Sequence, residues 1–438
     1  MGLQNLLRNA VKKGFSYMFS LIEDFKSFLD TSPTSWHAVR QVGNRLSMKD
    51  FHPLEENQPW ELEKGKKYFV TRGGSIGTFC LPKEAPSKII LMAAHTDSPS
   101  FKVKPIPDIH QNGMSLLEVE SYGSPILHSW LNRDIALAGR IFFTNKKDEL
   151  QEELVFMDDV PMIIPELAIH LHREVNEKGP LLNKQEHLMP LFSLQSKDPI
   201  TLEGLLRRCF SFKSLISFDL HLVPLEPSRF LGVQGDMISS YRIDNLASVH
   251  AATCAMATYE GSSILPLSVF WDHEEIGSKS WEGAGSSFLN DLLTRIKSFY
   301  QLTEEEFLIL KRNSLCFSLD MAHGLNPMHL QKHDPNHQPL LGQGITFKSN
   351  ADLKYASSGY TLSSAIQICK KANLPFQHFV IRSDLVCGST VGPTITASTG
   401  IPTVDLGCAQ LSMHSSREIM AVQDYLDLNT FLAQALKP

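Results

Sequence analysis

The chain has 438 residues, of which 42% are hydrophobic and 20% charged, a balance typical of globular proteins with room for two or three domains. Its formal net charge of −6 argues against a nucleic-acid partner, because nucleic-acid binders usually carry a basic patch or stripe. The seven cysteines are odd in number and include no Cys-x-x-Cys pair. They therefore favour reduced thiols and a cytoplasmic location over a disulfide framework.

The N-terminal 25 residues are amphipathic but lack the apolar core and small-residue cleavage site of a signal peptide. Leu6 stands where N-myristoylation requires Ser or Thr, so we expect Gly2 to remain unacylated. No apolar run approaches the ~18 residues that suggest a membrane span, so we expect no membrane partner. The segment is expected to form a surface helix, with a targeting or assembly role as the alternative.

Helices followed by strands are predicted for the first hundred residues. Apolar residues recur at helical spacing in FSYMFSLIEDFKSFLD, and TSPTSWHAV begins a second helix with Ser, Thr and an early Pro. The Gly73–Gly74 pair predicts a hairpin turn between two strands. The run KIILMAA is continuously apolar, as in a central strand that is covered on both faces.

From about residue 100 to 235 the pattern changes, and we predict a separate inserted module there. Short strand-like pieces, LLEVESYG and IALAGRIFFTN, alternate with turns. The stretch PELAIHLHREVNEKG (165–179) is predicted to be helical, and a polar segment follows it.

After residue 236, helical and strand patterns alternate regularly. Strand candidates include PLSVFWD, SLCFSLDMAH, PFQHFVIRSD and IPTVDLGC, and helix candidates include NLASVHAATCAMATYE, SGYTLSSAIQICKKAN and VQDYLDLNTFLAQAL. This alternation predicts an α/β fold with a mostly parallel sheet flanked by helices.

Ionisable residues gather where the predicted strands end. They are His95 and Asp97, Asp244, Glu274 and Glu275, Asp320, and His414. In open α/β sheets, ligands bind outside the carboxyl ends of the strands. Each residue alone has a simpler explanation, such as a helix cap for Asp244. Together they favour one shared cleft, because buried carboxylates must be paired, bound to metal or neutralised.

Histidine nitrogens and carboxylate oxygens suit two divalent metal ions, with zinc as the first choice and manganese or cobalt as alternatives. Such a pair of ions can share a bridging carboxylate and a bridging water. Asp97 is placed to orient His95 by accepting its second ring N–H. Adjacent residues on an extended chain point in opposite directions, so Glu274 and Glu275 can serve water and metal separately.

Several motifs then make the chain resemble the aspartyl aminopeptidase family of di-zinc metallopeptidases over almost its whole length. They are AAHTDSP, YRIDNLAS, DHEEIGS, SLDMAHGLNP, KHDPNHQPLLGQG, CGSTVGP and LSMHSSREI. The HExxH motif of thermolysin-type sites is absent. The resemblance implies a catalytic domain in two parts, 1–99 and 236–438, interrupted by a dimerisation domain at 100–235. It also implies a large homo-oligomer, typically a dodecamer built from dimers with enclosed active sites.

The resemblance also implies roles for the clustered residues. Asp244 would bridge the two metals, and Glu274 would be the general base. The remaining ligands would be His95 and Asp320 for one ion, and Glu275 and His414 for the other.

Three further substrate contacts follow less directly from the resemblance. His170 would reach into a neighbouring subunit's site and His333 would contact substrate. Lys348 would recognise an acidic side chain, with a solvated strand lysine as the alternative. Asn132 stands where the family commonly has Asp, which bears on assembly or local hydrogen bonding, and the N-terminal extension is longer than usual.

The expected activity is metal-dependent release of N-terminal residues, acidic ones foremost, from peptide substrates, with Glu274 moving the proton. An aminopeptidase for neutral N-terminal residues remains an alternative, as does a di-metal deacylase or carboxypeptidase on the same scaffold. A metal-binding scaffold without catalysis is the non-enzymatic alternative.

Overall fold

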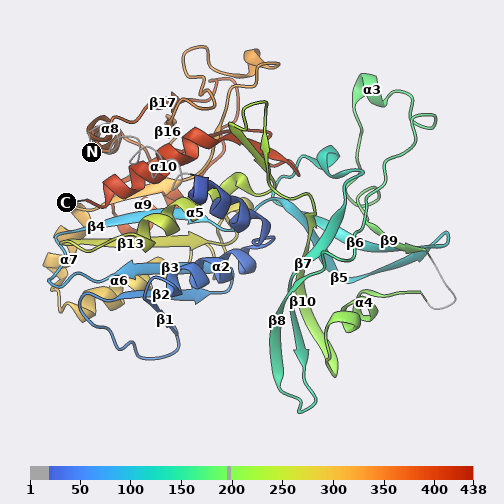
Figure 1. Cartoon of the computed structure of the whole chain (residues 1–438), viewed down its shortest axis with the longest axis horizontal. Helices are drawn as coiled ribbons and strands as arrows, with labels where there is room; N and C mark the ends of the chain where they lie inside the picture. Colours follow the sequence, from blue (N-terminus) through green and yellow to red (C-terminus); the bar gives the residue numbers. More distant parts are fainter. Residues whose placement is uncertain (1–18, 195–198, 438) are drawn as a thin grey trace, which may run out of the picture.

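The computed structural model describes residues 19–194 and 199–437, and three sheets organise them (Figure 1). The N-terminal positions Gly2 and Leu6, on which the acylation prediction depends, lie outside the described residues. No helix within the described part of the chain is long and apolar enough to cross a membrane.

The largest sheet has nine strands, and its centre is parallel. In spatial order the strands are β1 (Phe51–Leu54), β2 (Lys67–Arg72), β3 (Ser75–Cys80), β13 (Ile264–Trp271), β4 (Lys88–His95), β14 (Leu315–Leu319), β18 (Thr403–Gly407), β16 (Ile345–Lys348) and β17 (Phe376–Phe379). Strands β13, β4, β14 and β18 run parallel, whereas β2–β3, β3–β13 and β18–β16 are antiparallel pairs. The predicted α/β fold is therefore confirmed. The Gly73–Gly74 turn joins β2 to β3, with Arg72 opposite Ser75.

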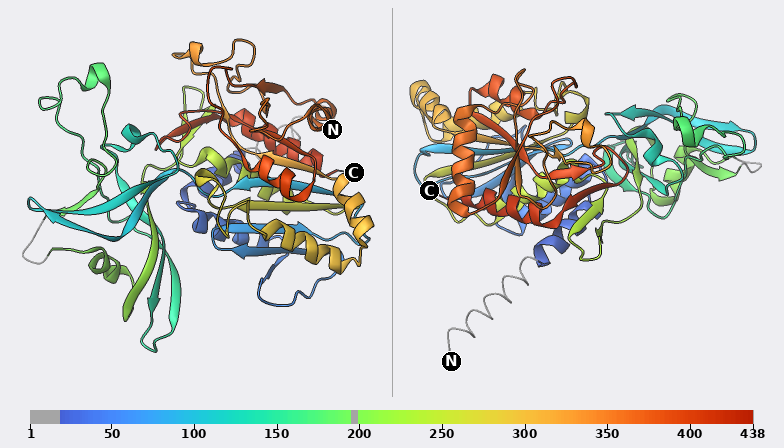
Figure 2. Two further views of the ribbon diagram at one scale, coloured as in Figure 1. Left: turned by 180° about the vertical axis from the view of Figure 1, so that it is seen from behind. Right: turned by 90° about the horizontal axis from the view of Figure 1, so that it is seen from above.

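Helices cover both faces of this sheet, as Figures 1 and 2 show. One face packs against the helix at 19–30, α2 (Ser35–Ser47), α5 (Ile243–Ala257), α8 (Gly359–Ala372) and α10 (Val422–Ala435). The other packs against α6 (Phe288–Phe299), α7 (Glu304–Arg312) and α9 (Val391–Thr399). Along β4, Ile90 and Met92 enter the first core while Ile89 and Leu91 enter the second. This two-sided burial explains why the β4 sequence is apolar without alternation.

A six-stranded antiparallel sheet extends to one side of the nine-stranded sheet (Figure 1). Its order is β8 (Leu150–Phe156), β7 (Ile135–Thr144), β10 (Ser214–Pro224), β5 (Ser100–Gln111), β6 (Met114–Tyr122) and β9 (Leu191–Leu194). It has a core of its own, which includes Phe101, Trp130 and Leu137, and α4 (Leu202–Cys209) adds Leu205 and Leu206. All its strands lie within the predicted insertion, whose role in dimerisation stays a prediction.

The predicted helix at 165–179 is largely wrong. Only α3 (Val175–Lys178) is helical there, and the apolar side chains of Leu167, Ile169 and Leu171 are exposed. A short helix needs a surface against which to bury its apolar face, and residues 19–194 and 199–437 offer this segment none.

The predicted strand at 314–323 divides into two strands in different sheets. β14 ends at Leu319, and β15 (Ala322–His323) joins a five-stranded sheet with β11 (Arg229–Leu231), β12 (Met237–Ser240), β20 (Glu418–Ala421) and β19 (Ala409–Leu411). Asp320 lies in the bend between β14 and β15. The bend leaves its carboxylate at the carboxyl edge of the large sheet.

Candidate metal centre

The predicted ionisable residues meet at the carboxyl edge of the central parallel strands. His95 is the last residue of β4, and Asp320 follows β14. Asp244 lies at the start of α5 with non-helical dihedral angles, so the simple helix-cap explanation does not describe it. The remaining members come from loops: Glu274 and Glu275 from the 3₁₀ turn after β13, and His414 from the β19–β20 connection.

The side chains form two ligand groups that share Asp244: the first also contains His95 and Asp320, and the second also contains Glu275 and His414. In the first group, His95 Nε2 lies 3.4 Å from Asp244 Oδ1 and 3.5 Å from Asp320 Oδ1. In the second group, His414 Nε2 lies 3.4 Å from Glu275 Oε2 and 3.7 Å from Asp244 Oδ2. Asp244 therefore turns one oxygen toward each group.

These residues fit metal ions better than they fit one another. The buried atoms Asp244 Oδ1 and Glu275 Oε1 have no hydrogen-bond partner in the described structure. An unsatisfied buried carboxylate oxygen is costly, and a cation is its usual compensation. Imidazole nitrogen and carboxylate oxygen are ligands that zinc accepts. The donor set thus suits divalent ions in both groups.

Glu274 lies beside both groups, with a carboxylate oxygen within 4.8 Å of ligand atoms of His95 and Glu275. Burial raises the pKa of Glu274 well above its usual value; nearby His95 opposes this shift, whereas Glu275 and Asp320 add to it. A carboxylate that holds a proton more readily than usual is suited to proton transfer near neutral pH.

Asp97 connects the first group to the Glu274–Glu275 turn. Its Oδ1 and Oδ2 accept the backbone N–H groups of Glu274 and Glu275, each at 3.1 Å. His95 Nδ1 lies 3.1 Å from the Asp97 backbone oxygen and 3.4 Å from Oδ1. The nearest partner of the His95 ring is therefore the Asp97 carbonyl, with the carboxylate slightly farther away.

Lys348 is not a solvated lysine, since it is only 1% exposed. Its Nζ donates to Asp320 Oδ2 at 2.9 Å and to the Met321 carbonyl at 3.1 Å. Burial would raise the pKa of Asp320, but Lys348 and His95 together lower it below its usual value. The solvated-lysine alternative is wrong, and the ammonium is already engaged with a candidate ligand.

Glu418 was missed from the sequence although it lies in the quoted motif LSMHSSREI. Its Oε2 accepts the Asp244 backbone N–H at 3.0 Å, and its Oε1 accepts that of His414 at 2.8 Å. Glu418 is buried, which is the main reason its pKa rises to about 8. A carboxylate within the otherwise apolar run EIMAV was the available signal.

The predicted substrate contacts are more dispersed. His333 lines a cavity of about 300 Å³ together with Lys332, Arg382 and Gln410. Gln410 Nε2 lies 3.4 Å from Asp244 Oδ2, so one residue of the cavity wall contacts the carboxylate that the two groups share. His170 is exposed in the turn before α3 and belongs to neither group.

Asn132, in the inserted region, has φ of +56°, a left-handed conformation that Asn tolerates better than most residues. Its side chain pairs locally with Glu166: Oδ1 accepts the Glu166 backbone N–H at 3.1 Å, and Nδ2 donates to Oε2 at 3.3 Å. Asn132 thus makes local hydrogen bonds and contributes to neither ligand group.

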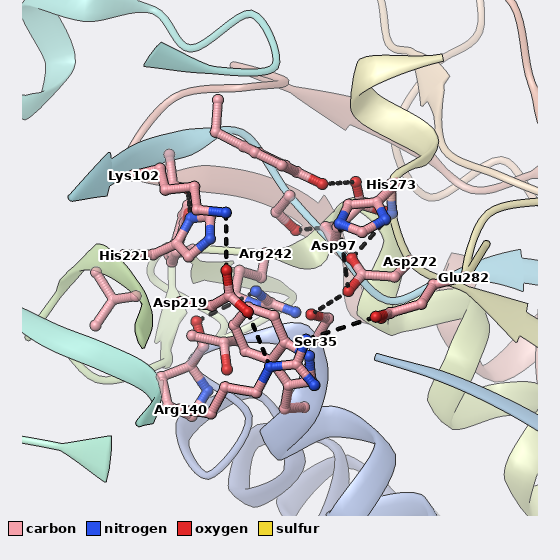
Figure 3. Close-up of a pocket in the computed structure, with 18 of the residues that line it drawn as sticks. Ser35, Asp97, Lys102, Arg140, Asp219, His221, Arg242, Asp272, His273 and Glu282 are labelled. Atoms are coloured by element: carbon pink, nitrogen blue, oxygen red, sulfur yellow. Dashed lines mark hydrogen bonds and ion pairs between the residues drawn. The ribbon is translucent and has the colours of Figure 1, made fainter. Parts of the chain in front are cut away.

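A second cavity, of about 230 Å³, lies on the other side of Asp97, between the inserted region and the large sheet (Figure 3). Lys102 and His221 reach it from the inserted strands, whereas Asp272 and Glu282 reach it from the segments after β13. Ser35 donates to Asp272 Oδ2 at 2.8 Å, and Lys102 pairs with Asp219 at 2.9 Å.

Comparison with known proteins connects this geometry to a family. Residues 28–434 match the family described as aminopeptidase I zinc metalloprotease (M18). The chain is 36% identical over 432 residues to the probable M18 family aminopeptidase 2 of Streptomyces coelicolor, covering 95% of this chain and 97% of that one. It is 34% identical to the aspartyl aminopeptidase of Dictyostelium discoideum, covering 92% of this chain and 93% of that one.

Solved structures give the same result. The structure of the Ape4 and Nbr1 complex matches with a TM-score of 0.89 and 30% identity, covering 96% of this chain and 86% of that chain. The mApe1 dodecamer of S. cerevesiae matches with a TM-score of 0.84 and 24% identity over 96% of each chain, which shows the shared fold.

Proposed function

This chain belongs to the M18 family of zinc metallo-aminopeptidases, and we propose that it releases N-terminal residues, acidic ones foremost, from peptides by means of two metal ions. The observation that carries the proposal is the pair of ligand groups sharing Asp244, with Glu274 beside both. Two groups joined by one carboxylate match the ligand arrangement of two-metal hydrolytic sites.

The metal ligands would be divided between the groups. His95 and Asp320 would hold one ion, Glu275 and His414 the other, and Asp244 would contact both. Zinc is the first choice for both ions, with manganese or cobalt as alternatives. When bound, the ions would polarise the scissile carbonyl and increase the acidity of the attacking water.

Glu274 would accept the proton of the attacking water and deliver it to the leaving amine. Its raised pKa supports this, because a buried carboxylate that binds a proton readily can also hold it between the two transfers. Asp97 would position Glu274 through the backbone N–H contact and would orient His95.

Preference for acidic N-terminal residues is supported by relatives named aspartyl aminopeptidase and by Lys332, which lines the cavity beside Gln410. Lys348 is paired with Asp320 and Arg382 with Asp384, so we assign recognition of the substrate carboxylate to Lys332, with His333 as a further contact. Lys332 lines the cavity together with Gln410, whose side-chain N–H donates to Asp244 Oδ2.

For assembly, we propose a cytoplasmic homo-oligomer of dimers, with twelve copies as in the mApe1 dodecamer. His170 would then enter the site of a neighbouring copy. Its exposure in a segment with uncovered Leu167 and Leu171 supports this proposal, because such apolar side chains favour burial against another chain.

The proposal is tested by release of the chromophore from Asp-, Glu- and Leu-anilides, before and after chelation and with zinc or manganese added back. We expect chelator-sensitive release that is fastest with Asp or Glu. Preference for Leu would retain the metal chemistry and overturn the acidic specificity. Turnover of N-acyl amino acids or C-terminal release, without anilide hydrolysis, would favour a deacylase or carboxypeptidase.

A further inference from the structure

We propose that residues 122–129, a segment of the inserted region, position both ligand groups of their own chain. The inference rests on the proposed function in one respect: it takes the two groups to be metal-binding. It gives the insertion a role inside each active site, separate from any contact between copies.

The first end of the segment acts on the His95 side. Tyr122 is the last residue of β6, and its hydroxyl donates to Asp97 Oδ2 at 2.8 Å. Asp97 in turn contacts the His95 ring and the Glu275 backbone. Tyr122 thereby fixes a carboxylate whose two oxygens connect the His95 ring with the Glu274–Glu275 turn.

The ring of Tyr122 is itself held in place. It packs edge-on against His221 of β10, with ring centroids 5.1 Å apart. His221 and Asp97 line the cavity shown in Figure 3, and so does Tyr122. The next residue, Gly123, has φ of +68°, and a Cβ there would stand 3.2 Å from Glu275 Cβ. The chain thus passes directly against a candidate ligand.

The second end of the segment acts on the His414 side. The Ile126 backbone N–H donates to the His414 carbonyl at 2.8 Å. Ser129 Oγ accepts the Ser416 backbone N–H at 2.9 Å, and the Ser416 hydroxyl donates to the Ser129 carbonyl. His414 has φ of +67°, which a residue with a side chain rarely adopts. The contacts from residues 122–129 help to maintain this conformation.

Groups that orient metal ligands affect affinity strongly, and their loss typically costs 10–100-fold. Tyr122 and Ser129 contact no candidate ligand side chain directly, so both are positioning residues. They belong to one short segment, yet each acts on a different group. Removing the Tyr122 hydroxyl should weaken ion binding in the first group, and removing the Ser129 hydroxyl should weaken it in the second.

The test measures zinc affinity by chelator competition in the full-length chain carrying Tyr122→Phe or Ser129→Ala. Each variant is expected to bind one of the two zinc ions about 10-fold more weakly, or weaker still, than the wild type does. With cobalt as the probe, the visible absorption spectrum should change as well, because it reports ligand geometry. Neither readout requires turnover.

Two variants provide matched controls far from the site. Tyr300→Phe removes a hydroxyl that donates to the Pro82 carbonyl at 2.6 Å. Ser314→Ala removes a buried hydroxyl that accepts from the Ile89 backbone N–H and donates to the Leu310 carbonyl, the same pattern as Ser129. Both controls should keep the wild-type zinc constants and cobalt spectrum.

Wild-type zinc constants and spectra in both Tyr122→Phe and Ser129→Ala would overturn the inference. Equal losses in the controls would also overturn it, since the effect would then be one of general stability. Wild-type protein that binds zinc but cleaves no anilide contradicts the proposed function alone, and the zinc constants of the variants still decide this inference.

Discussion

The two ligand groups are built differently although they share Asp244. The first group lies within the sheet: His95 ends a central strand and is 2% exposed, and Asp320 faces the buried Lys348. The second depends on loops: the His414 side chain is 26% exposed, and its backbone is held by Glu418 and by residues 122–129. Rigid strand ends preorganise a site at little further cost, whereas a loop ligand depends on its neighbours. We therefore expect the second group to release its metal first.

The largest effect is expected from replacing Glu274, the proposed general base that lies beside both ligand groups. Glu274→Gln should lower kcat by about 10²–10⁴-fold, because proton transfer to and from the reacting groups is lost. Metal content, measured on the same sample, should stay at the wild-type level. Turnover near the wild-type rate in this variant would contradict the assignment of Glu274 as the base.

A buried cation distinguishes the first group, and Lys348→Met would test its importance. Breaking a buried ion pair leaves Asp320 uncompensated, so the free energy of unfolding of metal-free protein should fall by about 3 kcal/mol. The loss should be smaller with zinc bound, since the ion then supplies positive charge to Asp320. Urea unfolding with and without a chelator measures both values.

Lys311→Met is a suitable control, because Lys311 lies on the outer helix α7, away from both groups. An equal loss in zinc-loaded and metal-free Lys348→Met protein would show that Lys348 supports the fold and has no particular relation to the first group.

Glu418→Gln tests the second ligand group, whose His414 backbone Glu418 holds. The amide keeps one acceptor but turns an N–H toward one of the two backbone N–H groups that Glu418 now binds. We expect about 10-fold weaker binding of the more weakly held ion, with a smaller change for the other. Chelator competition reads both constants, and equal losses would contradict the separate support of the two groups.

The smallest effect is expected from the His250–Asp24 pair, which lies outside both ligand groups. It tests the pH dependence of folding separately from that of the metal centre. Burial lowers the pKa of His250, but Cys254 and Asp24 raise it to about 9. Asp24 Oδ2 lies 3.0 Å from His250 Nε2. A raised pKa stabilises the fold fully below about pH 6.5, and this contribution is lost as pH rises through about 9.

Asp24 is half-exposed, so the contribution is discounted to about 1–2 kcal/mol. Urea unfolding between pH 6 and 9.5, in the presence of chelator, should show this decline in the wild type and a flatter profile in Asp24→Asn. Parallel profiles would show that the pair does not set the slope.

The sequence predicted the members of both groups because each follows a strongly apolar strand or falls in a distinctive motif. Glu418 and Tyr122 were not predicted from the sequence. Their importance comes from contacts with Asp244 and Asp97; the apolar run EIMAV marks Glu418 as unusual, but no local pattern indicates which distant residue either side chain contacts. Lys348 shows the same limit: a lysine in a strand gives no sign that it is buried against Asp320.

The fold followed a similar division. The alternation after residue 236 predicted the central strands because each must bury two faces. The helix at 165–179 was predicted from apolar spacing, but spacing indicates a helix only where a partner surface exists. Leu167 and Leu171 are exposed, so the described part of the chain offers them no such surface.

If two ions bind as proposed, the single carboxylate of Asp244 would couple their binding equilibria. An ion in the first group would be held in part by Asp244, and an ion in the second would be held by the same side chain, whose Oδ1 lies toward His95 and Oδ2 toward His414. Occupancy of one group would then change the affinity of the other for its ion, and thermodynamic linkage would make the factor identical in both directions. Titration curves should accordingly fit a model with an interaction constant between the ions, whose sign shows whether ordering of Asp244 outweighs repulsion between the two charges.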